Sequence, residues 1–559
     1  MSPAVPSTTR LRGHLGRPAV RDCAVLAATV IATSAASVSR LGFYSDDWGA
    51  LGIFTTSPDK SLFGLIREFL EKTPGRPIQA VNQAVLFWLF GLKPLLYHLE
   101  NTLVFICAIL LFYLCLTRIG LPRILTFTWP LVFALLPHYV TDRLWYAAFQ
   151  ANLSVALYFL SLYSGLRSIS TSGARRAVWG AVAMASMLCS LLAYEVVAPF
   201  FLLNLPVLWY CGRRSASKPE ATSRIYYLFS IFLPTVLALG LGFTYKVLFT
   251  DRTGVSGDYK AWVTWLAREC YFFHYVTFGL ELPAKVNHVL DTYFNPGLAI
   301  GAVAMGIALA MYLFPITGGS ALASIRRVDW IKTIAVGFLL TGLGTSVFLY
   351  TENIGFSETG ISTRMAIAAS VGTALAFLGI IGLTSSLLHW AAPVRIAFCI
   401  AIAALCASGF LIINTVAHFW VEAAERQAEV ISAVRQDFPS LPPKTTLILD
   451  GVCRYIGPGI VFETYWDVKG MLRVYYSDRT LDADVFTNTT EVKEDGIHTK
   501  MYDEVTVHSY EENLTVYNVR RRHSERIRNM DEGKRYVDTF GSDIHDCQPG
   551  REGAQAKIF

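Results

Sequence analysis

Residues 95–117 read LLYHLENTLVFICAILLFYLCLT, and this stretch indicates the fold class. After its first polar turns it is almost wholly apolar, and a helix of about 20 such residues is long enough to cross the hydrocarbon core of a bilayer. Comparable apolar blocks lie near residues 22–40, 95–117, 122–138, 147–166, 176–193, 196–211, 225–249, 297–316, 331–350, 365–388 and 395–418. The sequence therefore predicts an all-α polytopic membrane domain with about eleven transmembrane helices.

The overall composition agrees with a membrane protein. Of the 559 residues, 53% are hydrophobic and 16% are charged, and the mean hydropathy is +0.42. The net charge of +6 does not indicate a nucleic-acid partner, because the basic residues lie in short loops between apolar blocks, as the positive-inside rule describes. The first apolar block begins late and no Ala-x-Ala site follows it, so we expect a retained span and not a cleaved signal peptide.

The distribution of basic residues predicts the orientation in the membrane. With the basic N-terminal segment 1–20 in the cytoplasm, every second loop falls on the same side. Those loops carry Arg118, Arg123, Arg167, Arg175, Arg176, Arg213, Arg214, Lys218, Arg224, Arg326, Arg327 and Arg395. An odd number of spans then places the C-terminal region outside. The ionisable residues that fall at the outer face are Asp46, Asp47, His138, Asp142, Glu195, Glu352, Glu358 and Arg364.

The membrane domain, residues 21–419, has two long outer loops. The first, 41–94, contains an amphipathic stretch over 61–72 that predicts a helix in the membrane interface. The second, 251–296, is rich in aromatic side chains with helical spacing. Such rings favour the headgroup zone, so this loop either anchors the protein or forms a wall for a lipid-linked ligand.

The composition changes near residue 420, where charge rises and apolar runs shorten. We expect a helix over 420–437 and then a small extracytoplasmic α/β domain that extends to residue 540, followed by a flexible tail, 541–559. The predicted strands are 445–449, 472–476, 504–508 and 515–519. Most of the ten cysteines lie inside apolar blocks, but Cys453 and Cys547 lie in the C-terminal region and are candidates for a disulfide bond.

The adjacent carboxylates of Asp46 and Asp47 are the main candidates for catalysis. If they share a pocket, burial and like charge raise at least one pKa towards the range of a general base. Transfer of a sugar to a hydroxyl needs such a base, because the acceptor proton must leave as the new bond forms. The pair also suits a divalent cation, Mg²⁺ or Mn²⁺, beside a phosphate leaving group. A helix cap or a solvated loop is the structural alternative.

Other polar residues at the same predicted level suit a phosphate or an acceptor. His138 and Asp142 are four residues apart and share a face if that turn is helical. Glu195 interrupts a long apolar stretch, which a tight outer turn explains equally well. Lys246 and Arg364 are candidate phosphate contacts, since the forked donors of arginine match a phosphate, although a lysine near a span end also snorkels to the interface.

Several motifs resemble those of one family. Ser45-Asp46-Asp47-Trp48 is similar to the acidic pair of the first outer loop in the GT-C superfamily of polytopic glycosyltransferases, in the branch of protein O-mannosyltransferases and bacterial relatives that use polyprenyl-phosphate sugars. The other matching runs are Gly75-Arg76-Pro77, the stretch from Phe90-Gly91-Leu92-Lys93-Pro94 to Tyr97-His98 and Asn101, Leu136-Pro137-His138 with Asp142, Tyr194-Glu195, and Thr363-Arg364. Asp142 stands where the family has Glu, Leu136 where it has His, and Tyr194 where it has Lys. The likeness covers residues 40–200 best and does not reach the C-terminal domain.

This resemblance implies a GT-C-like fold and an inverting sugar transfer from a polyprenyl-phosphate carrier, with Asp46 or Asp47 as the base. Arg76, His138, Asp142, Glu195, Lys246 and Arg364 are then the residues expected to bind substrate or phosphate. The acceptor is expected to be an extracytoplasmic glycan, lipid or protein hydroxyl, and the location a bacterial plasma membrane. Two alternatives remain open: a transporter or flippase for lipid-linked glycans, and a non-catalytic membrane assembly protein.

Overall fold

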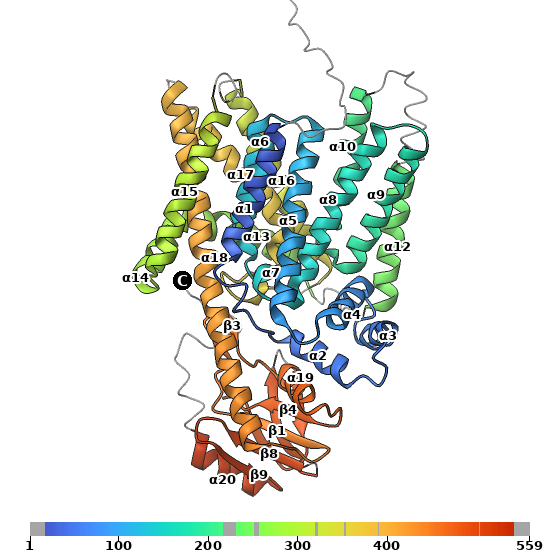
Figure 1. Cartoon of the computed structure of the whole chain (residues 1–559), viewed down its shortest axis with the longest axis vertical. Coiled ribbons are helices and arrows are strands. Elements are labelled where there is room, and N and C mark those ends of the chain that lie inside the picture. Colours follow the sequence, from blue (N-terminus) through green and yellow to red (C-terminus); the bar gives the residue numbers. More distant parts are fainter. Residues whose placement is uncertain are drawn as a thin grey trace, which may run out of the picture.

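The computed structural model describes residues 17–215, 231–250, 257–318, 322, 324–351, 354–388, 391–501, 504–511 and 513–541. These residues form a bundle of long helices with a smaller α/β domain at one end (Figure 1), which confirms the predicted combination of an all-α membrane domain and a C-terminal α/β domain. Each predicted apolar block contains a long helix. These helices are α1 (Arg17–Ser34), α5 (Pro94–Ile119), α6 (Arg123–Leu135), α8 (Phe149–Ile169), α9 (Ala174–Ala193), α10 (Phe200–Ser215), α12 (Leu233–Phe249), α15 (Pro296–Ile316), α16 (Arg327–Thr345), α17 (Ile367–Ser385) and α18 (Ala391–Asp437).

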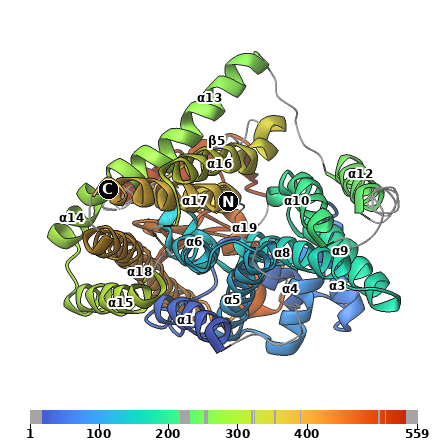
Figure 2. The ribbon, with the colours of Figure 1, turned by 90° about the horizontal axis from the view of Figure 1, so that it is seen from above.

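The chain is an integral membrane protein. Six helical segments of the described residues are long and apolar enough to cross a membrane, and the total number of spans stays a prediction. The outer surface of the bundle is apolar as well: on α15 the side chain of Ile300 is 70% exposed and on α12 that of Phe243 is 65% exposed. Large apolar faces of this kind suit contact with lipid. Figure 2 shows α6 inside the bundle and α1, α12 and α15 at its periphery.

A buried carboxylate joins four helices at the end of the bundle away from the C-terminal domain. Asp22 of α1 is fully buried and accepts hydrogen bonds from the guanidinium of Arg123 on α6 at 2.7 and 3.0 Å. It also accepts from the hydroxyls of Tyr113 on α5 and Tyr312 on α15, each at 2.8 Å. A buried charge with this many partners is compensated, so we interpret the cluster as structural.

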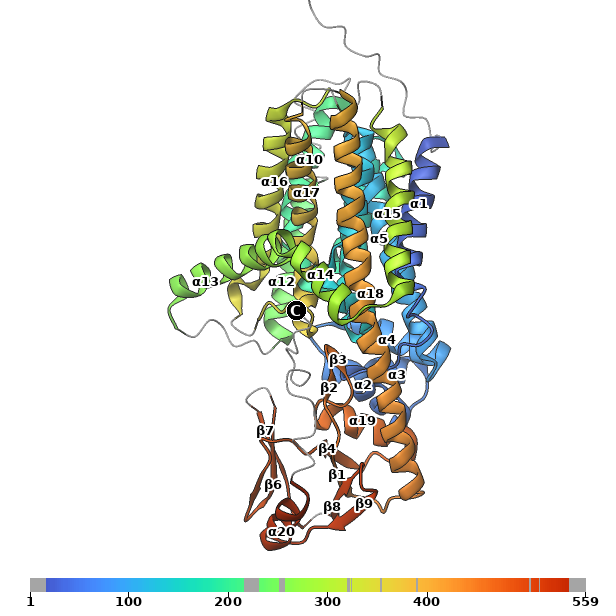
Figure 3. The same cartoon turned by 90° about the vertical axis from the view of Figure 1, so that its left-hand side faces the viewer.

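Short helices cover the opposite end of the bundle, beside the C-terminal domain. They are α2 (Asp46–Thr56), α3 (Leu62–Lys72), α4 (Pro77–Phe90), η1 (Pro137–Tyr139), α7 (Thr141–Leu144), η2 (Tyr146–Ala148), η3 (Glu195–Val197), α13 (Tyr259–Tyr271), η5 (Phe272–Leu280), α14 (Leu282–Thr292), η6 (Ser346–Tyr350) and η7 (Ile361–Ala366). Figure 3 shows α13 running across the direction of the long helices, as an interfacial helix does. In α3, Leu65 and Phe69 are buried while Phe63 is 83% exposed.

Helix α18 connects the bundle to the C-terminal domain. It is one continuous helix of 47 residues, and Figures 1 and 3 show it leaving the bundle and running down beside the sheet. The predicted boundary at residue 420 lies within this helix, and the helix expected over 420–437 is its second half. Because α18 is unbroken, it holds the start of the C-terminal sheet at a fixed distance from the bundle.

The C-terminal domain is built on a four-stranded sheet in the order β4-β1-β8-β9. The central strand β1 (Thr445–Asp450) pairs in parallel with β4 (Asp482–Val485) and β8 (Asn513–Asn518), and β9 (His523–Arg526) is antiparallel to β8. Its other elements are β2 (Tyr455–Ile456), β3 (Gly459–Ile460), α19 (Tyr465–Tyr476), β5 (Glu491–Lys493), β6 (Gly496–Met501), β7 (Glu504–His508) and α20 (Met530–Phe540).

One predicted strand is wrong. Residues 472–476 belong to helix α19 and not to a strand. The alternation of Leu472 and Val474 suggested period two, but Val468, Met471 and Leu472 are all buried with helical spacing. A helix is needed there because α19 connects two parallel strands, β1 and β4, which requires a crossover connection. Cys453 is disulfide-bonded, whereas Cys547 lies outside the described residues, as does Glu352, so the Cys453–Cys547 pairing stays a prediction.

Candidate active site at the end of the bundle

The two aspartates open helix α2, but their side chains differ in environment. Asp46 is exposed to solvent, whereas Asp47 is buried. The Asp47 carboxylate accepts a hydrogen bond from the backbone N–H of Tyr44 at 2.9 Å. Asp47 is therefore held within the fold, and Asp46 is the carboxylate that a substrate can reach.

The residue before the pair has a strained backbone. Ser45 adopts φ 44° and ψ −116°, a conformation that costs a non-glycine residue of the order of 1–3 kcal/mol and persists only where surrounding contacts fix it. Those contacts hold the preceding residue: the Tyr44 hydroxyl donates to the carbonyl of Trp420 at 2.8 Å, and the indole of Trp145 donates to the Tyr44 carbonyl at 3.0 Å. The strained turn thus lies between α18 and the loop 137–148.

Asp142 supplies a further carboxylate from α7. Its side chain is fully buried, and neither carboxylate oxygen has a hydrogen-bond partner among the described residues. Its main-chain carbonyl accepts from the side-chain amides of Asn101 and Asn152 at 2.9 and 2.7 Å, which fixes the loop. A buried carboxylate that lacks a partner is costly, so this one is suited to a hydroxyl or a cation that a ligand brings.

Among the cations, Arg364 has the largest electrostatic effect on Asp46 and Asp142. It lies on η7, which is joined to α7 by a hydrogen bond of 2.7 Å between the hydroxyls of Thr363 and Thr141. The guanidinium lies 5.0 Å from the ring centroid of Trp145. Burial raises the pKa values of both Asp46 and Asp142, and the charge of Arg364 opposes the rise in each. Arg364 therefore acts electrostatically on two acids that come from separate loops.

A second cationic group lies next to the first. The Glu195 carboxylate of η3 contacts the ammonium of Lys246 on α12 at 2.9 Å and the guanidinium of Arg76 at 3.8 Å. The Arg76 guanidinium also lies 4.7 Å from the ring centroid of Tyr194, and its charge acts on Asp46. One carboxylate shared by two cations leaves a net positive charge, which is suited to a phosphate.

His138 lies apart from these groups. It is fully buried, and its ring stacks on that of His274 in η5 with centroids 5.0 Å apart. Its Nε2 lies 3.2 Å from the His274 carbonyl. His138 belongs to η1 and Asp142 to α7, so the four-residue spacing does not place them on one helix, and the observed contacts of His138 are those of a packing residue.

Glu358, the other acid expected at the outer face, joins two outer segments. Its carboxylate lies 2.6 Å from the ammonium of Lys285, whose side chain is only 7% exposed. This pair connects α14 with the loop that precedes η7. The second long outer loop is thereby attached to the segment that carries Arg364.

One residue near the aspartate pair, Glu463, has no local signal in the sequence. It belongs to the C-terminal domain, is 4% exposed, and accepts a hydrogen bond from the Ser45 hydroxyl at 3.0 Å. The Tyr455 hydroxyl donates to its other carboxylate oxygen. Because Glu463 lies in a loop more than four hundred residues from the aspartate pair, no local pattern connects the two.

The surrounding protein shifts the pKa values of both aspartates, although the side chain of Asp46 reaches solvent and that of Asp47 does not. Desolvation by the surrounding protein raises the pKa of Asp46, the nearby Glu463 raises it further, and Arg364 and Arg76 oppose the rise. Desolvation also raises the pKa of Asp47 well above its usual value. An elevated carboxylate pKa is what a general base near neutral pH requires.

The residues present offer few ligands for a metal ion. No group of three or more His, Cys, Asp or Glu side chains within the described ranges is arranged to hold a metal. Asp46 and Asp47 would supply at most two carboxylates, so a Mg²⁺ or Mn²⁺ ion would need substrate phosphate and water as its other ligands. Arg364 and Arg76 act electrostatically on Asp46, and Lys246 shares the Glu195 carboxylate with Arg76.

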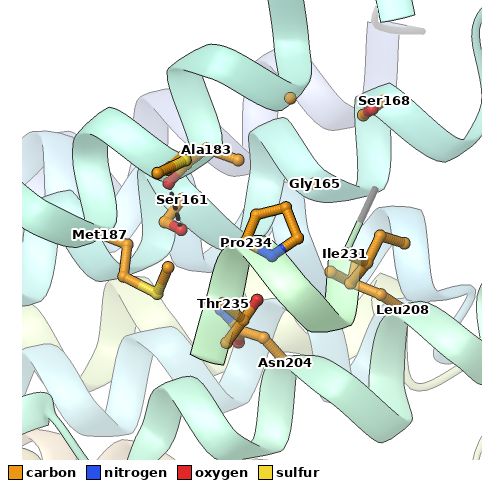
Figure 4. Close-up of a pocket in the computed structure, with 12 residues that line it drawn as sticks. Ser161, Gly165, Ser168, Ala183, Met187, Asn204, Leu208, Ile231, Pro234 and Thr235 are labelled. Atoms are coloured by element: carbon orange, nitrogen blue, oxygen red, sulfur yellow. Dashed lines mark hydrogen bonds between the residues drawn. The ribbon is translucent and has the colours of Figure 1, made fainter. Parts of the chain in front are cut away.

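A separate cavity inside the bundle is too small for a substrate. It has a volume of about 40 Å³ and is lined by α8, α9, α10 and α12. Figure 4 shows Ser161, Asn204 and Thr235 around it. The Oδ1 atom of Asn204 is buried without a hydrogen-bond partner in the described structure. A space of this size suits a water molecule, so the cavity is not a sugar site.

Comparisons with known proteins identify no family. No family model matches this chain, and no curated protein matches it. Two matching solved structures are of ArnT from Cupriavidus metallidurans, both 14% identical. The apo structure covers 82% of this chain and 84% of its own at a TM-score of 0.35; the structure bound to undecaprenyl phosphate covers 83% and 85% at a TM-score of 0.34. At these TM-scores the likeness carries no argument about function.

Proposed function

We propose that the protein is a membrane glycosyltransferase of the GT-C type that transfers a sugar from a polyprenyl-phosphate carrier to a hydroxyl outside the cytoplasm. The proposal rests on Arg364, whose charge acts on both the exposed Asp46 and the buried Asp142 at one end of the bundle and whose segment is bonded to that of Asp142 through Thr363 and Thr141. A base beside fixed cations, at the edge of an apolar helical bundle, suits a lipid-phosphate donor. The motif resemblance to polyprenyl-phosphate-dependent glycosyltransferases supports the same reading.

In this mechanism Asp46 is the base. It removes the proton of the acceptor hydroxyl while the oxygen attacks the anomeric carbon of the sugar from the side opposite the phosphate, so the configuration inverts. The bond between that carbon and the phosphate oxygen breaks, and polyprenyl phosphate leaves. Asp47 is assigned to holding the turn, because its carboxylate is buried and bonded to the Tyr44 N–H.

The leaving phosphate is stabilised by fixed positive charge. Arg364 lies on η7, which is bonded to the helix that carries Asp142. A second group, in which Arg76 and Lys246 share the Glu195 carboxylate, adds further positive charge. Preorganised donors of this kind are most effective where charge develops in the transition state. Asp142, buried and without a partner in the described structure, is assigned to a sugar hydroxyl, which donates the hydrogen bond that a carboxylate lacks.

The partners follow from this assignment. The donor is a polyprenyl-phosphate-linked sugar whose lipid lies among membrane lipids along the bundle, and the acceptor is an extracytoplasmic glycan, lipid or protein. The site faces the outside of a bacterial plasma membrane when the basic loops face the cytoplasm. A transporter would use ionisable groups at mid-bilayer. The fully buried Asp22 lies at one end of the bundle and is already bonded to Arg123 and two tyrosines.

Replacement of each aspartate tests the proposal. The protein is reconstituted in liposomes with radiolabelled polyprenyl-phosphate hexoses and pentoses and an envelope extract as acceptor, and the conversion of labelled donor into labelled product is measured after chromatographic separation. Asp46→Asn is expected to lower transfer by about 10²–10⁴-fold, the usual contribution of a general base. Asp59→Asn is the matched control, because Asp59 is an exposed acid of the same loop.

The proposal fails under either of two results. In the first, the wild-type protein moves no label from any donor to any acceptor. In the second, the folded Asp46→Asn protein transfers sugar as fast as Asp59→Asn. Survival of transfer in both Asp46→Asn and Asp47→Asn would favour a non-catalytic assembly role.

A further inference from the structure

The loop that carries Glu463 leaves the C-terminal sheet at the edge that faces the bundle. It connects β3 to α19 and is the last part of the segment that follows β1, which starts at the carboxyl end of the parallel strands and contains the hairpin of β2 and β3. Open α/β sheets commonly bind ligands at that edge. The loop lies against α18, where the side-chain amide of Gln427 donates to the carbonyl of Val461 at 2.5 Å. The segment that follows β1 is thus held against the helix that enters the membrane domain.

A close helix contact joins the same domain to the helix that begins with the aspartates. Helices α2 and α19 cross at Gly52 and Gly470: a Cβ atom on Gly52 would lie 2.8 Å from the Cα of Gly470, and one on Gly470 would lie 2.2 Å from the carbonyl oxygen of Trp48. No side chain fits between the two backbones at this crossing. The position of α2 is therefore determined by the C-terminal domain as well as by the bundle.

Glu463 is itself fixed from its own domain. Its backbone N–H donates to the Asp467 carboxylate at 2.6 Å, and Asp467 with Thr464 forms a capping box at the start of α19. The Tyr455 hydroxyl holds one carboxylate oxygen. The other oxygen accepts from the Ser45 hydroxyl at 3.0 Å, so an immobilised carboxylate reaches across to the strained residue beside Asp46.

We propose that Glu463 is a positioning residue of the active site, which acts by holding the strained backbone of Ser45 so that the Asp46 carboxylate faces the substrate. The C-terminal domain is then a working part of the catalytic centre and not an appended module. The catalytic half of this inference rests on the proposed glycosyltransferase function. The positioning half rests on the contacts alone, since strain at Ser45 persists only while its surroundings fix it.

Two measurements on the full-length protein test the inference. Hydrogen exchange of the segment 43–50 reports positioning whether or not sugar is transferred, and the transfer assay reports its consequence. The variants are Glu463→Ala, Glu463→Gln, Ser45→Ala and the double variant of Glu463→Ala with Ser45→Ala. Asp484→Asn is the matched control, because Asp484 is a buried, hydrogen-bonded carboxylate of the same domain, bonded to Thr499 and His508.

Glu463→Ala is expected to raise amide exchange in 43–50 by at least about tenfold, the effect of losing one hydrogen bond to a charged group. It should lower kcat by about 10²-fold with the donor KM within about threefold, since a displacement of about 1 Å has that effect on a reacting group. Glu463→Gln still bonds the Ser45 hydroxyl and should restore exchange and most of the turnover. The double variant should be no worse than Glu463→Ala within about twofold, because both changes remove one interaction.

Unchanged exchange in 43–50 for the folded Glu463→Ala protein overturns the inference, whatever the activity. So does an equal loss of turnover in Asp484→Asn, because the effect would then be general to the domain. If exchange responds as expected while the wild-type protein transfers no sugar, the positioning role stands and the proposed function fails.

Discussion

Replacement of Gly470 by alanine should separate the C-terminal domain from α2 and reduce sugar transfer. The new Cβ atom would lie 2.2 Å from the Trp48 carbonyl oxygen, 2.4 Å from its carbon and 2.6 Å from the nitrogen of Gly49. All three are backbone atoms and cannot turn aside. Real Cβ contacts essentially never fall below 3.0 Å, so α19 must move away from α2 by about 0.8 Å, within the cost of about 1–3 kcal/mol typical of overpacking.

This displacement is enough to break the contact at the site. A shift of about 0.8 Å would lengthen the 3.0 Å bond between Ser45 and Glu463 to about 3.8 Å, beyond hydrogen-bonding distance. Transfer in the liposome assay should then fall by about 10²-fold, the effect of misplacing a reacting group by about 1 Å. Alanine is the better helix former by about 1 kcal/mol, so the helix content measured by circular dichroism should not fall.

Gly212→Ala is the matched control, because Gly212 is also helical but has no atom within 4 Å of the added Cβ. The control should transfer sugar at the wild-type rate. Equal rates for folded Gly470→Ala and Gly212→Ala proteins would refute the reasoning, since the tight crossing would then have no influence on the site.

Two further predictions concern charge. Arg364→Gln should lower kcat by about 10²–10³-fold, as loss of a fixed transition-state donor does, and should move the acid limb of the pH profile to higher pH. The base works as a carboxylate and Arg364 lowers the pKa of Asp46, so removing that charge raises the pKa; an acid limb that stays in place would contradict this. Treatment with EDTA should leave transfer within about threefold, because Arg76, Lys246 and Arg364 supply the positive charge; a larger loss that Mg²⁺ or Mn²⁺ restores would place a cation at Asp46.

The candidate site was only partly predictable. Ionisable residues next to apolar spans are costly and fall at helix ends, which singles out Asp46, Asp142 and Arg364 in the sequence. In the structure the charge of Arg364 acts on both aspartates. The residue type of His138 and its spacing from Asp142 predict a role in the site, but its ring is fully buried and stacks on that of His274. The choice between Asp46 and Asp47 needed burial, which two adjacent identical residues do not reveal.

The sequence by itself determined the helical bundle and the separate α/β domain, because long apolar helices and the change to shorter, more polar segments near residue 420 are both local signals. Only the tertiary structure decided how the two parts meet. The crossing of α2 and α19 depends on Gly52 and Gly470, and the bond from Ser45 to Glu463 joins residues from opposite ends of the chain. Contacts of this range leave no periodic pattern, since they depend on where whole elements pack and not on neighbouring residues.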